Sequence, residues 1–372
     1  MNNNRILVTG CCGTVGQELV RQILQSTEDS LELIGIDNNE SELFFIDQSY
    51  IADPRASFYL ADMRDFDALD SLFSDIDIVF HAAAFKHVVL CERSPMEAIQ
   101  TNIIGVQNIV SAARKNKVQK VLFTSSDKAV NPTSVMGTSK LMGERLMTAA
   151  NSNMRKGDTV FASTRFGNVL GSNGSVIPIF KNQIKAGGPV TITDKEMTRF
   201  IMTIEEAAKL VISSADLAKG GEVLITKMPV ISIHDLAQVM IEILAPYYGH
   251  KSESISINVI GCKPGEKLYE ELMSDEETRR SVELKDYFSV LPAYRGIYRD
   301  IHYKYDQTVS ESVDNPYNSS CEKKMSREDL KKYLLEKGLL LDEEGGEPLQ
   351  RYWPGDKENT TADITEVDAT NV

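Results

Sequence analysis

The sequence lacks the long apolar runs of a membrane-spanning protein, and it has few cysteines. No stretch of about eighteen apolar residues occurs, and the start, Met-Asn-Asn-Asn-Arg, has no apolar signal-peptide core. The five cysteines are odd in number and lack the paired spacing of metal ligands. We therefore expect a cytoplasmic protein that is not inserted in a membrane, forms no disulfide framework and binds no metal ion.

Basic residues are also in deficit. The chain has 40 lysines and arginines against 54 acidic residues, a net charge of −14, which argues against nucleic acid or an anionic membrane as a partner. Part of the excess lies at the end, because the segment from Asp342 to Val372 has nine acids and two bases. This acidic, threonine-rich segment predicts a disordered tail.

A glycine-rich turn near the amino terminus carries the first functional signal. Residues 5–9 form a compact apolar run, glycines follow at positions 10, 13 and 16, and residues 17–24 have apolar residues at helical spacing. A strand, a glycine turn and a helix are the context of a dinucleotide site, although such a turn can also serve packing alone. Asp37 follows the glycines by about twenty residues, where a carboxylate binds a ribose 2′-hydroxyl. It favours NAD, with NADP as the alternative.

Strands and helices are expected to alternate through the first half of the chain. Apolar runs predict strands at 32–36, 57–61, 76–84, 120–125 and 160–165, and helical spacing predicts helices at 66–73, 95–115 and 134–150. This order predicts an α/β fold with a Rossmann-type, doubly wound parallel sheet. We expect a dinucleotide-binding domain over 1–170, whose sheet continues into later segments, a smaller substrate-binding lobe over 171–335, and the tail over 342–372.

The segment after the strand at 120–125 concentrates reactive side chains. Ligands of such sheets bind at the carboxyl ends of the strands, so Ser126, Asp127 and Lys128 should enter the crevice beside the nicotinamide. Lys140 lies on the next helix, and Met136 lies one turn before it, so the two should face the same way. Taken one at a time, these residues also have simpler explanations: Asp127-Lys128 could be a solvated turn pair, and Met136 could fill space in the core.

These motifs resemble those of the extended short-chain dehydrogenase/reductase superfamily, and within it the nucleotide-sugar 4,6-dehydratases of capsule and flagellin-sugar pathways. The resemblance covers about residues 5–335 and rests on the stretches 9–16, 81–87, 101–105, 125–132, 136–140, 165–169, 197–200 and 263–267. Most of the superfamily has a Tyr-x-x-x-Lys motif. Here Met136 stands at the tyrosine position, as in a subset of dehydratases that includes membrane-anchored homologues.

The resemblance implies a 4,6-dehydratase that acts on UDP-N-acetylglucosamine or its GDP analogue. NAD takes a hydride from C4, water is lost across C5 and C6, and the hydride returns to C6 to give a 4-keto-6-deoxy sugar nucleotide. Asp127 is the implied acid, and Lys128 is the base at C5 if burial or charge lowers its pKa. Ser126 would bind the C4 oxygen, and Lys140 the nicotinamide ribose. Because Met136 cannot accept the C4-hydroxyl proton, Asp127 is the first candidate for that step and a water held by Lys140 the second.

Further contacts are implied for both ligands. The cofactor contacts are assigned to Gly10, Gly13, Thr14, Val15, Gly16, Asp37, Asp62, Met63, Ala82, Ala83, Ala84, Asn102, Ser125 and Lys140. The substrate contacts are assigned to Lys86, Asn168, Arg199 and Glu266, with Arg199 on the diphosphate, which suits a guanidinium. The alternatives for Lys86, Asn102 and Arg199 are a surface cation, a helix-entry hydrogen bond and a structural ion pair.

Two other functions stay open. A nucleotide-sugar 4-epimerase needs no acid–base pair for C5 and C6, so Asp127 and Lys128 favour the dehydratase. A non-catalytic NAD-binding regulatory protein would explain the missing tyrosine, but the intact Asp127, Lys128 and Lys140 argue against it. The resemblance also implies a homodimer or higher homo-oligomer, paired through the helices at 95–115 and 134–150.

Overall fold

The computed structural model describes residues 5–25, 30–152, 158–171, 176–261, 266–298 and 300–340. Residues 1–340 belong to one compact unit. The predicted disordered tail at 342–372 and the motif residues 263–265 lie outside the described residues. Within the described ranges, no helix is long and apolar enough to cross a membrane.

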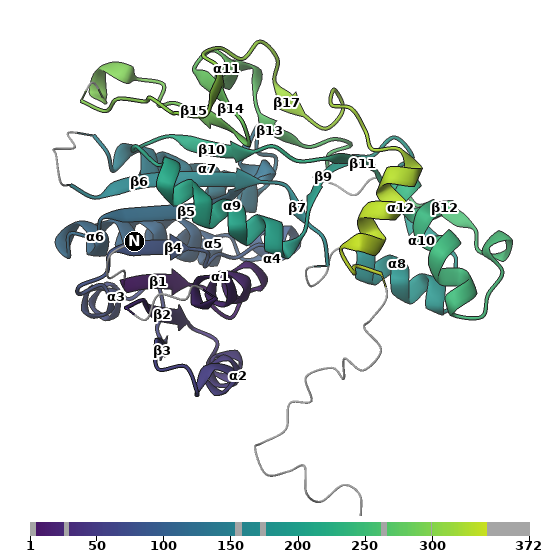
Figure 1. The fold of residues 1–372 in the computed structure, drawn as a ribbon, viewed down its shortest axis with the longest axis horizontal. Coiled ribbons are helices and arrows are strands. Elements are labelled where there is room, and N and C mark those ends of the chain that lie inside the picture. Colours follow the sequence, from purple (N-terminus) through teal and green to yellow (C-terminus); the bar gives the residue numbers. More distant parts are fainter. Residues whose placement is uncertain are drawn as a thin grey trace, which may run out of the picture. The chain divides into compact units, whose positions relative to one another are not determined.

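A ten-stranded sheet is the centre of this unit, in the order β16-β14-β15-β10-β6-β5-β4-β1-β2-β3 (Figure 1). Its strands are β1 (Arg5–Thr9), β2 (Glu32–Asp37), β3 (Ala56–Leu60), β4 (Ile78–His81), β5 (Lys120–Ser126), β6 (Val160–Phe166), β10 (Val223–Thr226), β14 (Ser281–Leu284), β15 (Tyr287–Val290) and β16 (Thr308–Ser310). Neighbours from β3 to β10 run parallel, whereas β15, β14 and β16 add an antiparallel edge. The predicted doubly wound α/β class is confirmed, and its ligand-binding switch point lies between β1 and β4.

Helices cover both faces of the sheet, which is why its central strands are continuous apolar runs. In β1, Val8 packs in a core with helices α1 and α9, and Leu7 packs on the opposite side with α3, α6 and α7. The helices are α1 (Thr14–Leu24), α2 (Glu40–Tyr50), α3 (Phe66–Leu72), α4 (Val88–Arg93), α5 (Pro95–Ile99), α6 (Gly105–Lys115), α7 (Val135–Ala149), α8 (Val176–Lys185), α9 (Ile204–Leu217), α10 (Ile233–Tyr247), α11 (Asp275–Thr278) and α12 (Arg327–Glu336).

The later part of the chain builds a second core beside the sheet. Helices α8, α10 and α12 pack there around Ile184, Leu236, Leu244 and Leu330. Three small sheets lie outside the main one, in the orders β11-β9-β7, β12-β8 and β13-β17. Their strands are β7 (Asn168–Val169), β8 (Val190–Ile192), β9 (Thr198–Met202), β11 (Val230–Ser232), β12 (Ile257–Val259), β13 (Glu271–Met273) and β17 (Tyr317–Asn318). Because β10 and β14–β16 return to the main sheet, the boundary at residue 170 stays a prediction.

The helix predicted at 95–115 contains a π-helical segment, Gln100–Ile104, between α5 and α6. This segment carries Asn102, whose side chain accepts from the Phe85 backbone N–H at 2.8 Å and donates to the Phe85 carbonyl at 3.0 Å. It also donates to the Ser139 hydroxyl at 2.9 Å. The buried Asn102 amide therefore fixes the loop after β4, and its predicted cofactor contact stays a prediction.

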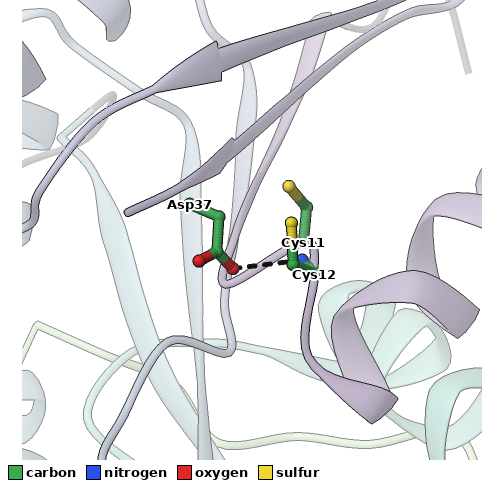
Figure 2. Close-up of side chains that lie close together, drawn as sticks. All are labelled: Cys11, Cys12 and Asp37. Atoms are coloured by element: carbon green, nitrogen blue, oxygen red, sulfur yellow. Dashed lines mark hydrogen bonds between the residues drawn. The ribbon is translucent and has the colours of Figure 1, made fainter. Parts of the chain in front are cut away.

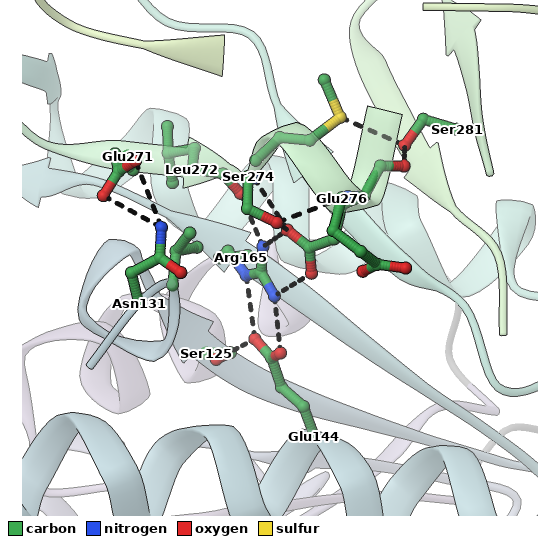
Figure 3. Close-up of polar contacts among 12 residues, drawn as sticks. Ser125, Asn131, Glu144, Arg165, Glu271, Leu272, Ser274, Glu276 and Ser281 are labelled. Atoms are coloured by element: carbon green, nitrogen blue, oxygen red, sulfur yellow. Dashed lines mark hydrogen bonds and ion pairs between the residues drawn. The ribbon is translucent and has the colours of Figure 1, made fainter. Parts of the chain in front are cut away.

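A buried ion-pair network joins β5, β6, α7 and α11 (Figure 3). The Arg165 side chain, 1% exposed, lies 2.6 Å from Glu144 and 3.1 Å from Glu277. The Ser125 hydroxyl donates to Glu144 at 2.5 Å. Its side chain therefore belongs to this network and does not line one of the cavities described below. Successive strand residues point to opposite faces, which explains why Ser126 lines a cavity when Ser125 does not.

Candidate active site

Three cavities meet along the carboxyl edge of the parallel strands. The largest, about 690 Å³, extends from the glycine turn to Asp127 and Asn168. A second cavity of about 330 Å³ shares Asp127, Lys128 and Asn168 with it. A third, about 160 Å³, shares Gly10 and Ala84 with the largest. The shared residues join the cavities into one crevice at the switch point of the sheet, where the sequence predicts the ligands.

The glycine turn leaves room in front of helix α1. Gly10 has a φ of +69°, and a Cβ there would lie 2.7 Å from the Ala83 backbone. Gly13 is the N-cap of α1, so no side chain covers the helix terminus. Together with Thr14 and Val15, these residues line the largest cavity. A clear helix N-terminus with free backbone N–H groups suits a pyrophosphate.

We expect Gly16→Ala to lower the free energy of unfolding by about 1–3 kcal/mol through overpacking, because its Cβ would lie 2.0 Å from the Gly10 carbonyl oxygen. Urea denaturation measures the change. Gly296→Ala is the matched control, since nothing lies within 4 Å of a Cβ at that position. Equal stability of the two variants would show that the turn tolerates a side chain.

Asp37 ends β2 beside the glycine turn. Its carboxylate accepts from the backbone N–H groups of Cys12 at 3.1 Å and Asn39 at 3.0 Å, and it lines the third cavity.

The ligand atoms of Cys11, Cys12 and Asp37 lie within 4.8 Å of one another (Figure 2). The fold creates this group, which has no metal-site spacing in the sequence. A hydrogen bond with Cys12, together with burial, raises the pKa of the Cys11 thiol and opposes the thiolate that binds metals. The absence of a metal stays a prediction.

Asp62 and Met63, two of the predicted cofactor contacts, have different surroundings. Met63 lines the third cavity with Ala82, Ala83 and Ala84. The Asp62 carboxylate instead binds the Arg64 guanidinium at 2.6 Å and is not among the residues that line this cavity. Its predicted role at the cofactor therefore gains no support from the geometry.

Ser126, Asp127 and Lys128 form a hydrogen-bonded cluster at the end of β5. The Ser126 hydroxyl donates to the Asp127 carboxylate at 2.6 Å, and the Lys128 amine lies 3.1 Å from both carboxylate oxygens. Ser126 also caps the short 3₁₀ turn Asp127–Ala129 by accepting from the Lys128 backbone N–H. The Asp127 side chain is 6% exposed and that of Lys128 is 38% exposed. This arrangement places a hydroxyl, a carboxylate and an amine at the junction of two cavities.

A lowered pKa, the condition under which Lys128 could act as the base, is not met in this structure. Burial lowers the pKa, but the charges of Asp127 and Glu270 outweigh burial and raise it above the ordinary lysine value. A carboxylate at 3.1 Å favours the charged amine, so Lys128 is protonated at neutral pH.

Lys140 and Met136 lie in different surroundings although one helical turn separates them. The Lys140 amine donates to the Thr124 carbonyl at 3.0 Å and lines the largest cavity. Burial, opposed by Glu144, lowers the pKa of Lys140 to about 8. Met136 is buried with Cys91 and Ala98 and does not line the three cavities. The geometry therefore supports core packing for Met136.

The predicted substrate residues lie on both sides of the junction. Lys86 is exposed and lines the largest cavity, whereas Asn168, Arg199 and Glu266 line the second. The Arg199 guanidinium donates to the Thr198 carbonyl at 2.7 Å and the Lys267 carbonyl at 2.9 Å. The structure brings the predicted residues together, and their contacts with a substrate stay predictions.

Glu270 is the site residue that sequence reasoning missed. Its buried carboxylate accepts from the Asn168 amide at 2.8 Å and lies 3.2 Å from Arg199 Nε. Burial, followed by the charge of Asp127, raises the pKa of Glu270 to about 7. In the sequence it stands beside Glu271, and its position just after the motif at 263–267 was the one available signal.

Sequence comparisons find one family and several relatives that are similar to most of this chain. It matches the family described as polysaccharide biosynthesis protein over residues 6–292. The uncharacterized membrane protein MJ1061 of Methanocaldococcus jannaschii is 46% identical over 90% of this chain and 96% of its own length. CapD, a capsular polysaccharide biosynthesis protein of Staphylococcus aureus, is 40% identical over 84% of this chain but 50% of its own, so the chain spans half of that relative. A UDP-glucose 4-epimerase of Rickettsia felis is 37% identical over 91% and 97% of the two chains.

Solved structures agree with the fold and the family. Pen from Bacillus thuringiensis has a TM-score of 0.80 and 39% identity, covering 90% of this chain and 98% of its own. DesIV, a dTDP-glucose 4,6-dehydratase from Streptomyces venezuelae solved with NAD, has a TM-score of 0.60 and 23% identity over 71% and 86% of the two chains, which shows the fold alone. Because the family match spans most of the sheet and the site, the chain belongs to the polysaccharide biosynthesis protein family, within the nucleotide-sugar dehydratase and epimerase superfamily of enzymes, as the resemblance predicts.

Proposed function

We propose that the protein is an NAD-dependent nucleotide-sugar 4,6-dehydratase that acts on UDP-N-acetylglucosamine. The observation that carries this proposal is the Asp127–Lys128 ion pair, which lies where the cavity of the glycine turn meets the cavity of Arg199 and Glu266. Elimination across C5 and C6 needs one group that takes a proton and one that gives a proton. Epimerisation at C4 does not use such a pair at C5 and C6.

NAD fits the residues of the largest and the third cavities. The glycine turn lets its backbone lie close to that of Ala83, where a Cβ on Gly10 would not fit. It also leaves the N-terminus of α1 open to a pyrophosphate. Asp37 would hold the adenosine ribose, and Lys140, which lines the same cavity as Asp127, the nicotinamide ribose. When bound, NAD supplies a hydride acceptor for C4 and a hydride donor for C6.

The protein's own groups would move three protons. Ionised Asp127 accepts the proton of the C4 hydroxyl, while Ser126 holds the C4 oxygen. Loss of the carboxylate charge removes the main influence that keeps Lys128 protonated, and burial then favours its neutral form. Lys128 releases its proton to solvent, to which its side chain is 38% exposed, and takes the C5 proton. Asp127 then protonates the C6 hydroxyl, which leaves as water. Lys128 returns a proton to C5 as the hydride is added at C6, and it then regains its own proton from solvent. A water held by Lys140 is the second candidate for the first step.

The oligomer predicted from the resemblance also belongs to this proposal. Helices α5 and α7 and the π-helical segment expose Met96, Ile104 and Met142, each at least 42% accessible. Apolar side chains on the predicted pairing helices support a homodimer. Sedimentation of the protein at micromolar concentration tests this, and a monomer would contradict it.

Mass spectrometry after incubation with UDP-N-acetylglucosamine tests the reaction. A product lighter by one water supports the dehydratase, and loss of water from only the GDP analogue would change the substrate but not the reaction. Because a relative covering 91% of the chain is named a UDP-glucose 4-epimerase, UDP-glucose is assayed in parallel. An altered sugar of unchanged mass would identify the epimerase instead, and no turnover with any of the three would contradict both.

A further inference from the structure

We propose that Glu270 occupies the place of the substrate diphosphate in the ligand-free protein and takes up a proton when a nucleotide binds. This inference rests on the nucleotide-sugar site proposed above, but it does not depend on the reaction that follows. In this proposal Glu270 is a positioning residue that couples ligand binding to the uptake of a proton.

The geometry places Glu270 against Arg199, which is expected to bind the diphosphate, and against Asn168, another predicted substrate contact. Its side chain is 6% exposed, and one carboxylate oxygen contacts both the Asn168 amide, at 2.8 Å, and Arg199 Nε, at 3.2 Å. The remaining Arg199 nitrogens donate to backbone carbonyls, among them those of Thr198 and Lys267. Of the Arg199 contacts, the one with Glu270 is therefore the one that a ligand anion can replace without breaking a hydrogen bond from the guanidinium to the backbone. The second Glu270 oxygen accepts from the Phe200 backbone N–H at 3.3 Å, and this bond would also be given up.

The surrounding charges favour protonation of Glu270 when an anion enters. Arg199 faces it from β9, and Asp127 and Lys128 face it from the 3₁₀ turn. On its own segment, Lys267 and Glu271 pair with each other at 3.2 Å. A diphosphate adds negative charge beside two carboxylates, and like charges at short range disfavour the ionised form.

The direction of the pH dependence follows from these charges. Burial and Asp127 already raise the pKa of Glu270 to about 7 in the free protein, so the group is ionised above pH 7 and largely protonated below it. The bound nucleotide raises the pKa further. Nucleotide binding above pH 7 should therefore be accompanied by uptake of at most about one proton. As the pH rises from the pKa of the free protein to that of the complex, the affinity should fall about tenfold per pH unit.

Isothermal titration of the full chain with UDP at pH 8, in buffers of different ionisation enthalpy, measures this proton. We expect uptake of close to one proton by the wild type and much less by Glu270→Gln, whose Kd should also vary little with pH. The matched control is Glu271→Gln, which removes the neighbouring carboxylate and should keep the uptake.

Two outcomes would overturn the proposal, and they are distinguishable. Binding of UDP without proton uptake by the wild type, or equal uptake by wild type and Glu270→Gln, would refute the role of Glu270 alone. Failure of the wild type to bind either UDP or GDP would refute the nucleotide site itself. Binding without proton uptake and failure to bind are both measured on the wild type alone, so the test stands even if Glu270→Gln does not fold.

Discussion

Replacing Lys128 with alanine should slow exchange of the sugar C5 proton with solvent by at least about a hundredfold, since a positioned general base contributes about 10²–10⁴-fold. The amine lies at the junction of the two larger cavities, 3.1 Å from Asp127. Nuclear magnetic resonance of the sugar nucleotide in D₂O follows the exchange. Because Asp127 raises the pKa of Lys128, the wild-type rate should also rise with pH above 7.

The control for this experiment is a second lysine in an ion pair. Lys227 binds Glu283 at 2.7 Å and does not line the three cavities, so Lys227→Ala should exchange the C5 proton like the wild type. NAD binding, measured by fluorescence titration, should survive in Lys128→Ala because the glycine turn is intact. Exchange at the wild-type rate in Lys128→Ala would refute the assignment of the base.

Arg165→Met should lower the free energy of unfolding by about 3–5 kcal/mol, because removing one partner leaves buried charges uncompensated. The guanidinium, 1% exposed, pairs with both Glu144 and Glu277. Urea denaturation of the purified variants measures the loss. The control Arg327→Met removes an exposed pair with Asp235, whose side chains are 55% and 28% accessible, and should cost less than about 1 kcal/mol.

The same network should make the wild type sensitive to acid. Burial alone would raise the pKa of Glu277, but Arg165 outweighs burial and lowers the pKa to about 2. A lowered carboxyl pKa stabilises the fold above the unfolded value of 4.5, and this stabilisation is lost as the pH falls from 4.5 to about 2. The role of the network would be contradicted if Arg165→Met and Arg327→Met lost similar amounts of unfolding free energy at neutral pH. It would also be contradicted if the stability of the wild type did not fall in this acid range.

The first half of the fold was predictable because its strands are buried on both faces. The run at 5–9 coincides with β1, and the run at 120–125 differs from β5 by one residue. Strands β14–β16 have three or four residues each, too short for a periodic pattern, so the antiparallel edge was not foreseen. Helices α2 and α4 were missed, as were α8 to α12 in the later part of the chain. The π-helical segment carries Asn102, whose contact with the loop after β4 has no signal in the sequence.

In the site, adjacency in the chain was predictable and long-range contact was not. Ser126, Asp127 and Lys128 are consecutive, so the end of one strand brings them together. Glu270 meets Asn168 across 102 residues of sequence, and it is one of the charges that raise the Lys128 pKa. The carboxylates of Asp127 and Glu270 are both present in the sequence, but only the fold shows that both act on the Lys128 amine.

The fate of the C4 hydrogen tests the proposed 4,6-dehydratase reaction most directly. The protein is incubated with UDP-N-acetylglucosamine that carries deuterium at C4, and the product is examined by mass spectrometry and nuclear magnetic resonance. A 4,6-dehydratase moves that hydrogen within the sugar, so we expect a product lighter by one water with deuterium at C6. A sugar of unchanged mass that keeps its deuterium at C4 would contradict the proposed function.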